Sequence, residues 1–129
     1  MQNKHLHRFS IILILVMSFM PTIYAHHPTQ GMSKTKYKVT FIELGSVRCI
    51  PCQQMQSVMK SIGKKYGNQV KVVFHDVWTP EGKPFGKQYN IEAIPTQVFL
   101  DEEGKEFLRH VGFFPEEELV KVLQSKGVK

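Results

Sequence analysis

Apolar residues recur along this chain at two spacings, one typical of strands and the other of helices. Residues 37–44 alternate and are rich in β-branched and aromatic side chains, which predicts a strand. Gly45 and Ser46 interrupt that strand. A helical spacing begins at Pro51, and Gly67 offers a stop for the helix. The apolar positions of this predicted helix are Met55, Val58, Met59, Ile62 and Tyr66.

Three further strands are predicted in the second half of the chain. Residues 70–77 form an apolar run bounded by turn residues, which is typical of a buried strand. Residues 96–100 and 105–111 have the composition of strands, and a turn at residues 101–104 joins them. These two strands are therefore expected to pair as a hairpin, and Gly112 ends the second one.

The segments between and after these strands are predicted as a loop and helices. Residues 79–86 are rich in proline and glycine, so we expect a loop there, with a short helix at residues 87–90. Residues 116–124 have acids in the first turn and apolar residues on one face, which predicts a final helix. The chain therefore reads as β-α-β, a short helix, then β-β-α, in one α/β domain.

The first 25 residues have the order of a secretory signal peptide. A basic start with Lys4 and Arg8 precedes an apolar stretch at residues 11–20, and Ala25 offers a small residue for cleavage. The apolar stretch is shorter than the ~20 residues that a membrane span needs. We therefore expect an exported protein, in the periplasm, either soluble after cleavage or held by an uncleaved N-terminal anchor.

The segment that follows the signal sets the expected domain boundaries. Residues 26–36 lack apolar periodicity and are expected to be a polar lead-in. Residues 37–129 then form the folded domain. A total of 129 residues suits one domain, and 42% hydrophobic with 22% charged residues is an ordinary globular composition.

Net charge argues against nucleic-acid binding. The chain has 17 Lys and Arg against 11 Asp and Glu, and two of the basic residues lie in the first 25 positions, which carry no acid. The 15 basic residues that follow are scattered, and only Arg48 and Arg109 among them are arginines. A nucleic-acid surface usually concentrates its basic residues, so no nucleic-acid partner is expected.

Cys49 and Cys52 are the only cysteines, and their spacing favours redox chemistry. A disulfide between them closes a very short loop and would stabilise the fold little. Zinc prefers four ligands, and the chain offers no second Cys-x-x-Cys, so no metal site is expected. A structural disulfide and a metal pair stay open as alternatives, but an active dithiol fits the spacing best.

The predicted elements assign different roles to the two cysteines. Cys49 lies at a strand-to-helix turn, where the helix dipole and free amides favour a thiolate and lower its pKa. Arg48 adds positive potential, and Pro51 suits the first helical turn because it lacks an amide hydrogen. Cys52 lies one turn further in. We therefore expect Cys49 to attack a disulfide and Cys52 to resolve the mixed disulfide.

The segment from Phe41 to Cys52, the Ile94-Pro95-Thr96 motif and Gly112 together resemble the thioredoxin-fold family. The resemblance covers roughly residues 37–123. It implies a central mixed sheet flanked by helices, with Pro95 in the cis form against the dithiol. It also implies that an extended substrate segment pairs with the backbone of residue 94 near Cys49.

The same resemblance points to Glu43 as a proton acceptor. Glu43 lies six residues before Cys49, where members of the family usually have a buried aspartate that serves the second cysteine. A buried carboxyl has a raised pKa and can exchange protons near neutral pH. Strand alternation also allows the alternative that Glu43 faces solvent at a strand end.

Three positions depart from the family pattern. Arg48 replaces the tryptophan usual before the first cysteine, and Gly45 replaces another common aromatic residue. The lysine that often partners the buried acid falls near Val72, so that link is missing. The redox potential and the substrate contacts can therefore differ from those of ordinary thioredoxins.

The residues around the dithiol favour a disulfide reductase. Strong exported oxidants of the family commonly have a histidine beside the second cysteine, where this chain has Pro51, and Ile94 resembles the reducing members. Arg48, Ile50, Pro51, Ile94 and Thr96 are expected to contact the substrate. The alternatives are a thiol oxidase or isomerase of the same fold, and a Cu(I) carrier that uses both thiolates.

The expected partners follow from the reductase assignment. Substrates are protein disulfides, with apocytochrome c during cytochrome c maturation as one candidate. No segment suited to a nicotinamide or flavin is visible, so we expect no cofactor and an inner-membrane thiol carrier as electron donor. The protein is expected to act as a monomer.

Overall fold

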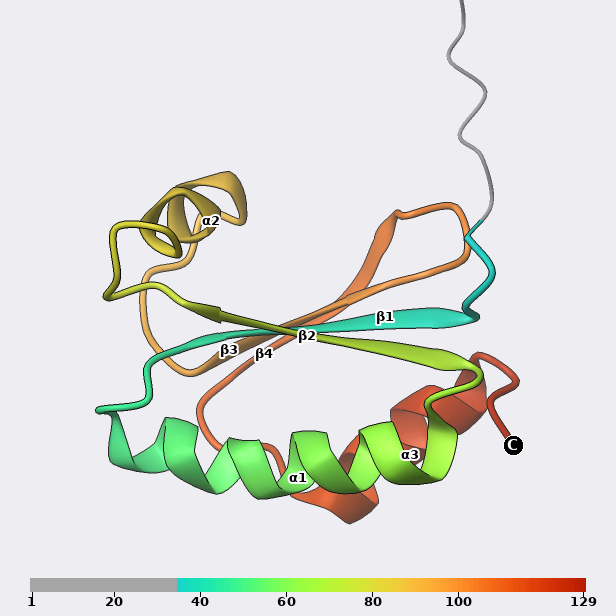
Figure 1. Ribbon diagram of the computed structural model, residues 1–129. Coiled ribbons are helices and arrows are strands. Elements are labelled where there is room, and N and C mark those ends of the chain that lie inside the picture. Colours follow the sequence, from blue (N-terminus) through green and yellow to red (C-terminus); the bar gives the residue numbers. More distant parts are fainter. Residues whose placement is uncertain (1–34) are drawn as a thin grey trace, which may run out of the picture. The chain divides into compact units, whose positions relative to one another are not determined.

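The computed structural model describes residues 35–129, which form a four-stranded sheet with helices on both faces (Figure 1). The segments predicted as signal and most of the polar lead-in lie outside the described residues. Among residues 35–129, no helix combines the length and hydropathy needed to cross a membrane. The elements in chain order are β1 (Val39–Gly45), α1 (Ile50–Tyr66), β2 (Val70–Asp76), α2 (Lys83–Gln88), β3 (Thr96–Leu100), β4 (Glu106–Val111) and α3 (Glu116–Ser125).

The sheet is mixed, with strand order β2-β1-β3-β4. β1 pairs in parallel with β2 and antiparallel with β3, and β4 completes the hairpin with β3. β1 is buried along its whole length because it has a strand on each side and helices above and below. The segment that leaves the end of β1 is therefore held by the most enclosed strand of the sheet.

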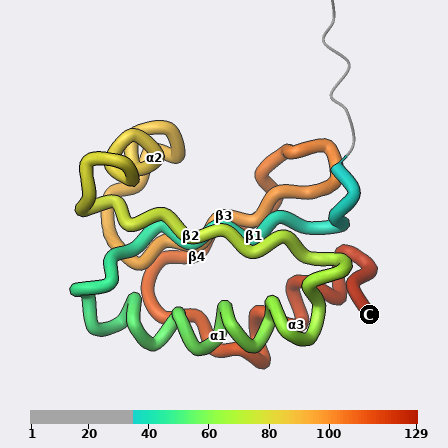
Figure 2. Tube along the Cα trace, in the orientation of Figure 1, coloured from blue at the N-terminus to red at the C-terminus, as the bar shows by residue number. Residues whose placement is uncertain are grey.

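The helices divide between the two faces of the sheet, with α1 and α3 on one face and α2 on the other (Figure 2). The larger core lies under α1 and α3, where the Phe41 and Phe99 rings of neighbouring strands stack 5.0 Å apart. Met55 from α1 and Leu119 from α3 pack against this core. A smaller cluster of Ile42, Leu44 and Val98 packs against Phe85 and Tyr89 on the α2 side.

Most predicted elements are confirmed, and the short helix is the exception. The predicted loop at residues 79–86 and helix at residues 87–90 are both wrong, because α2 begins at Lys83 and ends at Gln88. Thr79 makes this start possible: its Oγ1 accepts a hydrogen bond from the Gly82 amide at 3.1 Å. Proline in the first turn costs the helix no internal hydrogen bond, so the Pro/Gly-rich composition does not prevent it.

Candidate active site

The Cys49–Cys52 pair lies at the junction between the turn that follows β1 and the start of α1. Cys49 is the N-cap of α1 in an extended conformation, and the Cys52 amide donates a hydrogen bond to Cys49 Sγ at 3.4 Å. Pro51 occupies the first turn of the helix, and lysines rather than acids stand at the other end. A thiolate at Cys49 would therefore lie against the positive end of the helix dipole, which favours the charged form.

The two cysteines form a disulfide and differ in accessibility. Their Cα atoms lie 5.2 Å apart. Cys49 is 9% exposed, whereas Cys52 is completely buried. Because an attacking sulfur must reach the atom it attacks, Cys49 is the sulfur of this disulfide that another molecule can meet.

The Ile94–Pro95 peptide bond is cis, as the resemblance implies, and it borders the turn that carries the cysteines. Thr96 pairs with Leu44, so the residues before β3 lie beside the end of β1. Thr96 Oγ1 donates to the Ala93 carbonyl at 2.7 Å, and the Gly112 amide donates to the Pro95 carbonyl at 2.8 Å. These two bonds fix the segment on both sides of Pro95 and leave Ile94 half-buried at the surface.

Glu43 is buried on β1, so the alternative that it faces solvent is wrong. Its Oε2 accepts a hydrogen bond from Gln97 Nε2 at 2.9 Å, and its Oε1 has no hydrogen-bond partner among the described residues. Burial raises the pKa of Glu43 to about 8, and the Gln97 hydrogen bond opposes that rise. At neutral pH the carboxyl is therefore mostly protonated.

Gly45 lies between this carboxyl and the buried sulfur. A Cβ atom at Gly45 would lie 3.2 Å from Cys52 Sγ and 3.2 Å from Glu43 Oε1. The two atoms are therefore no farther apart than twice that distance. The missing side chain keeps the space between acid and sulfur open, so the glycine that departs from the family pattern has a local role.

Arg48 lies beside Trp78 at the surface. Its guanidinium carbon is 5.7 Å from the centroid of the Trp78 ring, which is within the range of a cation–π contact. Asp76 fixes both neighbouring segments, because its carboxylate accepts the Val47 amide at 3.1 Å and the Trp78 amide at 3.0 Å. Desolvation opposes ionisation of Asp76, but these two amides, a hydrogen bond with Ser46 and the charge of Arg48 together outweigh it and lower the pKa of that carboxyl.

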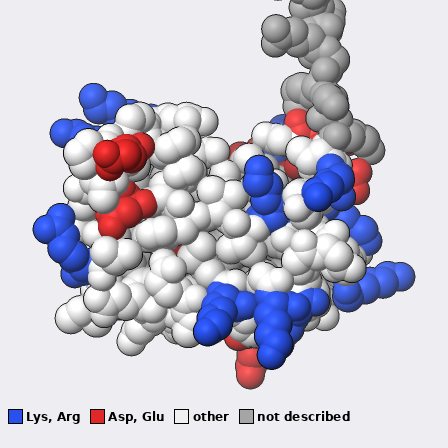
Figure 3. Space-filling view, viewed as in Figure 1, with Lys and Arg blue, Asp and Glu red and all other residues white. Residues whose placement is uncertain are grey.

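Large exposed apolar side chains surround the disulfide. Val47 lies two residues before Cys49 and Ile50 lies directly after it, and Trp78 is held to the same turn through Asp76. Val111 and Phe113 flank Gly112, which is bonded to Pro95. We call these five residues the apolar rim. In Figure 3 the surface at the lower left, over the start of α1, is mostly uncharged, with basic side-chain atoms just above it at the left edge and further Lys and Arg side chains dispersed elsewhere.

Sequence reasoning identified part of this rim and missed the rest. Ile50 was predicted to contact the substrate, but Val47 and Val111 were not singled out. Val111 is the last residue of β4 and is 57% exposed. The sequence does contain a signal for them, because Val47 lies within two residues of Cys49 and Val111 lies next to Gly112. Gln97 was also missed, since nothing in a strand pattern shows which residue an amide will face.

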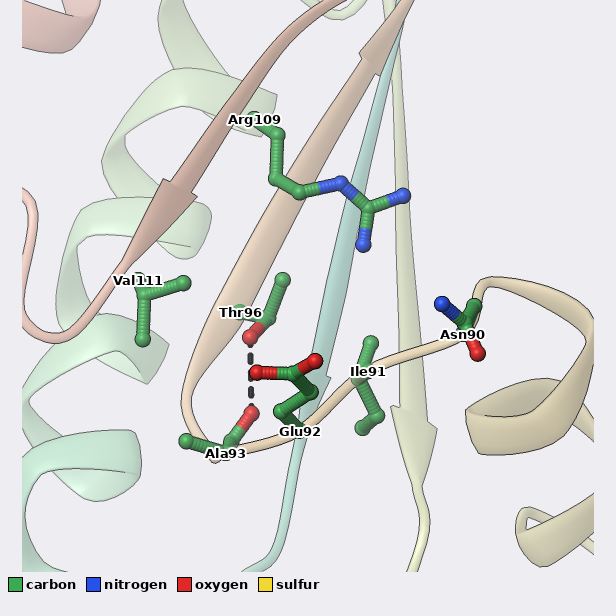
Figure 4. Close-up of a pocket in the computed structure, with 7 residues that line it drawn as sticks. All are labelled: Asn90, Ile91, Glu92, Ala93, Thr96, Arg109 and Val111. Carbon is green, nitrogen blue, oxygen red and sulfur yellow. Dashed lines mark hydrogen bonds between the residues drawn. The ribbon is translucent and has the colours of Figure 1, made fainter.

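A hollow of about 350 Å³ adjoins the segment before Pro95 (Figure 4). Ala93, Thr96 and Val111 line it on the side of the rim, and Arg109 lies across it. The Arg109 guanidinium is already bonded to Glu106 and to the Tyr89 carbonyl, each at 2.8 Å. Glu92 also lines the hollow, which therefore offers both shape and an acidic side chain beside the cis-proline segment. Among residues 35–129, no cluster of three or more His, Cys, Asp or Glu could hold a metal ion.

Comparison with known proteins gives relatives of one kind. The pattern of a family described as "Thioredoxin-like domain" matches residues 29–127. "Thioredoxin Y, chloroplastic" of Oryza sativa is 28% identical over 88 residues, which cover 68% of this chain and 51% of that protein. "Thioredoxin 1" of Synechococcus elongatus is 35% identical over 77 residues, covering 60% of this chain and 69% of that protein. The chain thus spans about half the length of the rice relative.

Solved structures agree with the architecture. The germline-specific thioredoxin Deadhead of Drosophila melanogaster superposes with a TM-score of 0.59 at 26% identity, over 68% of this chain and 80% of that one. The thioredoxin of Fasciola hepatica superposes with a TM-score of 0.61 over 70% of this chain and 83% of that one, and at 23% identity it supports the fold alone. With a matching family pattern over most of its length and the same sheet with flanking helices, this chain belongs to the thioredoxin-like family.

Proposed function

We propose that this protein is a thiol-disulfide oxidoreductase that reduces protein disulfides in an exported compartment. The observation that carries the proposal is the Cys49–Cys52 disulfide at the start of α1, with Cys49 the partly exposed cysteine and Cys52 fully buried near an acid. A disulfide that only stabilised the fold would close a longer loop and would need no proton acceptor.

The reduced form carries out the reaction in two exchanges. Cys49 thiolate attacks one sulfur of the substrate disulfide, forms a mixed disulfide and releases the other substrate sulfur as a thiolate, which takes up a proton. Glu43 in its carboxylate form, which is the minor form at neutral pH because the pKa is raised to about 8, then accepts the Cys52 proton, and Cys52 attacks Cys49 Sγ. The second substrate sulfur leaves as a thiolate. Two electrons pass to the substrate, and the protein is left as the disulfide.

The surface around Cys49 supports a protein substrate. The main chain of Ile94 makes no hydrogen bond within residues 35–129, so its amide and carbonyl can pair with an extended segment. The apolar rim would cover apolar side chains on either side of the substrate cysteine. Unfolded or locally open proteins present such segments, and apocytochrome c is one candidate of this kind.

Two sequence features support the direction and the compartment. Pro51 stands beside Cys52, where a histidine would stabilise the thiolate and make the pair more oxidising. The basic, apolar and small-residue order of residues 1–25 supports export. An exported reductase must be kept reduced, so we propose an inner-membrane thiol carrier as its electron donor.

The reaction is tested by substituting each cysteine separately. Cys49→Ser is expected to abolish reduction of insulin disulfides by dithiothreitol-fed protein, because no surface sulfur is left to attack. Cys52→Ala is expected to accumulate Cys49-linked mixed disulfides, seen by mass spectrometry after acid quenching. Ser57→Ala, on the exposed side of α1, is the matched control and should keep full activity. Full activity of Cys49→Ser would contradict the mechanism.

Export is tested by cell fractionation. In a Gram-negative host, the full chain is expected in the periplasmic or membrane fraction, and a chain without residues 2–25 is expected in the cytosol. The same distribution for both chains would show that the segment does not direct export. N-terminal sequencing of the exported form separates cleavage after Ala25 from an uncleaved anchor.

A further inference from the structure

Three polar side chains lie in a row across the sheet on the face that α1 covers. The register pairs Glu43 of β1 with Gln97 of β3, and Gln97 with His110 of β4, so the three share one face of neighbouring strands. Glu43 and Gln97 are both fully buried. Burying an amide in a core is costly unless it bonds to something, so Gln97 needs an explanation that packing does not give.

The Gln97 amide makes two hydrogen bonds through one nitrogen. Nε2 donates to Glu43 Oε2 at 2.9 Å and to the Gly112 carbonyl at 3.1 Å. A carbonyl oxygen can only accept, so the bond to Gly112 fixes which end of the amide faces Glu43. Gln97 therefore always presents a donor to the carboxyl, never its own oxygen.

This arrangement makes the two carboxyl oxygens of Glu43 different. Oε2 is occupied as an acceptor by Gln97. Oε1 has no hydrogen-bond partner among the described residues and borders the open space at Gly45, on whose other side lies Cys52 Sγ. In the carboxylate form, Oε1 is therefore the oxygen left free to accept a proton, and it lies on the side of the sulfur.

We propose that Gln97 is a positioning residue for the resolving step, which it serves by holding Glu43 through Oε2 and leaving Oε1 to exchange a proton with Cys52. The inference rests on the proposed function. The Cys52 proton moves to Glu43 Oε1, the Cys52 electron pair forms the bond to Cys49 Sγ, and the substrate sulfur leaves with the electron pair of the broken bond.

Gln97 also links the acid to the surface that meets the substrate. Its second bond reaches the Gly112 carbonyl, the Gly112 amide bonds to the Pro95 carbonyl, and Gly112 stands between two residues of the apolar rim. One amide thus spans from the proton acceptor to the cis-proline segment. Gln97 gives Glu43 an uncharged hydrogen-bond partner. This chain has Val72 near the position where the family often has a lysine beside the buried acid.

The groups that face Glu43 are few. Within the described chain, α1 contributes Cys52, β2 contributes Phe74 in register with Glu43, and β3 contributes Gln97. His110 of β4 lies beyond Gln97 in the row, with its Nε2 3.2 Å from the Phe113 carbonyl. Cys52 does not titrate in the disulfide form, so the oxidised protein isolates the effect of Gln97 on Glu43.

The first test measures Glu43 in the oxidised protein by carbon-13 NMR of labelled glutamate carboxyl groups across pH. Gln97→Met keeps the length of the side chain but removes the donor, and Gln97→Leu is a second variant should the first fail to fold. Either is expected to move the Glu43 inflection upward by about one pH unit, because a hydrogen bond to the charged form is lost. Gln54→Leu, the same change on the exposed side of α1, should leave it unmoved. An unmoved inflection in the Gln97 variants would overturn the proposal.

The second test follows the resolving step itself. Reduced protein is mixed with a chromophoric aromatic disulfide, so that attack by Cys49 and resolution by Cys52 appear as two phases. In the Gln97 variants the second phase is expected to slow by about tenfold at pH 7 and to recover at high pH, since a shift of one unit leaves a tenth of the base form. Equal slowing at every pH would indicate a merely structural role and contradict the proposal. Absence of both phases in the wild-type protein would instead contradict the proposed function.

Discussion

Burial distinguishes Glu43 from the acids at the surface, because its side chain has no exposed area. Water cannot solvate the carboxylate, so the pKa rises to about 8, and the single Gln97 donor does not restore it. Surface acids behave in the opposite way: hydrogen bonds from Lys65 and Ser61 lower the pKa of Glu116. Two carboxyl groups of one chain are thus separated by their surroundings, and only the buried one is suited to proton exchange near neutral pH.

This pKa predicts how stability depends on pH. The folded chain holds the Glu43 proton up to a pKa of about 8, whereas the unfolded chain releases it near 4.5. The contribution of Glu43 is therefore fully present below the unfolded pKa and is lost as pH rises through the folded pKa. Across that window, the free energy of unfolding falls by up to roughly 1.4 kcal/mol per pH unit.

Glu43→Gln tests that dependence, because an amide of the same shape has no proton to lose. Urea unfolding of the oxidised protein at pH 5, 6.5 and 8 is expected to show wild-type stability falling relative to the variant as pH rises. The variant should be the more stable protein at pH 8. Parallel pH profiles for the two proteins would show that Glu43 is not protonated in the folded state at neutral pH.

The residue roles differ in how much sequence could predict. Cys49, Cys52, Pro95 and Glu43 stand at positions where spacing and family resemblance indicate chemistry. Gln97 has no such indication, because its importance comes from facing Glu43 across two paired strands. Strand pairing joins residues that are 54 positions apart in the chain, and periodicity within one strand says nothing about the partner.

At the level of elements, the turn between β1 and α1 determines where the two cysteines lie. β1 is central and buried, and α1 begins five residues after β1 ends, with Cys49 as its cap. A strand fixed on both sides and a helix packed on the core hold the turn between them. This is why a short surface turn can place one sulfur outside and another inside.

The elements with strong periodicity were predicted well and α2 was not. β3 was predicted with its observed bounds, and α1 and α3 within a residue or so of theirs. α2 has six residues with a proline and a glycine among them, so its periodicity is too short to outweigh its composition. Before its first turn, the Thr79 hydroxyl donates a hydrogen bond to the Asp76 carbonyl and accepts one from the Gly82 amide, and composition does not reveal these contacts.

Two glycine substitutions test this account of the elements. A Cβ at Gly82 would lie 1.9 Å from the Asp76 carbonyl oxygen, so Gly82→Ala should lower the free energy of unfolding by about 2–3 kcal/mol. Gly63 lies on the exposed side of α1, and the nearest atom to its Cβ would be 3.9 Å away. Gly63→Ala should raise stability by about 0.5–1 kcal/mol through helix propensity. Equal effects of the two substitutions, measured by urea unfolding, would contradict the packing described around α2.

Across the whole molecule, the disulfide, the cis-proline segment and the apolar rim gather at one end of the sheet. The ends of β1 and β2 and the start of β3 meet there because β1 is parallel to β2 and antiparallel to β3. Strand order could not be predicted from periodicity, and the family resemblance implied only a mixed sheet flanked by helices. The rim could be predicted only in part, because exposure at the end of β4 depends on where α3 packs.

The reduction potential of the Cys49–Cys52 pair decides between a reductase and an oxidant of this fold. It is measured by equilibrating the protein in dithiothreitol or glutathione buffers and counting alkylated thiols by mass. We expect a reduction potential near that of thioredoxin, about −270 mV, because Pro51 stands where strong oxidants of the family have a histidine that stabilises the thiolate. A value near about −120 mV would show a strong oxidant and contradict the proposed direction of electron flow.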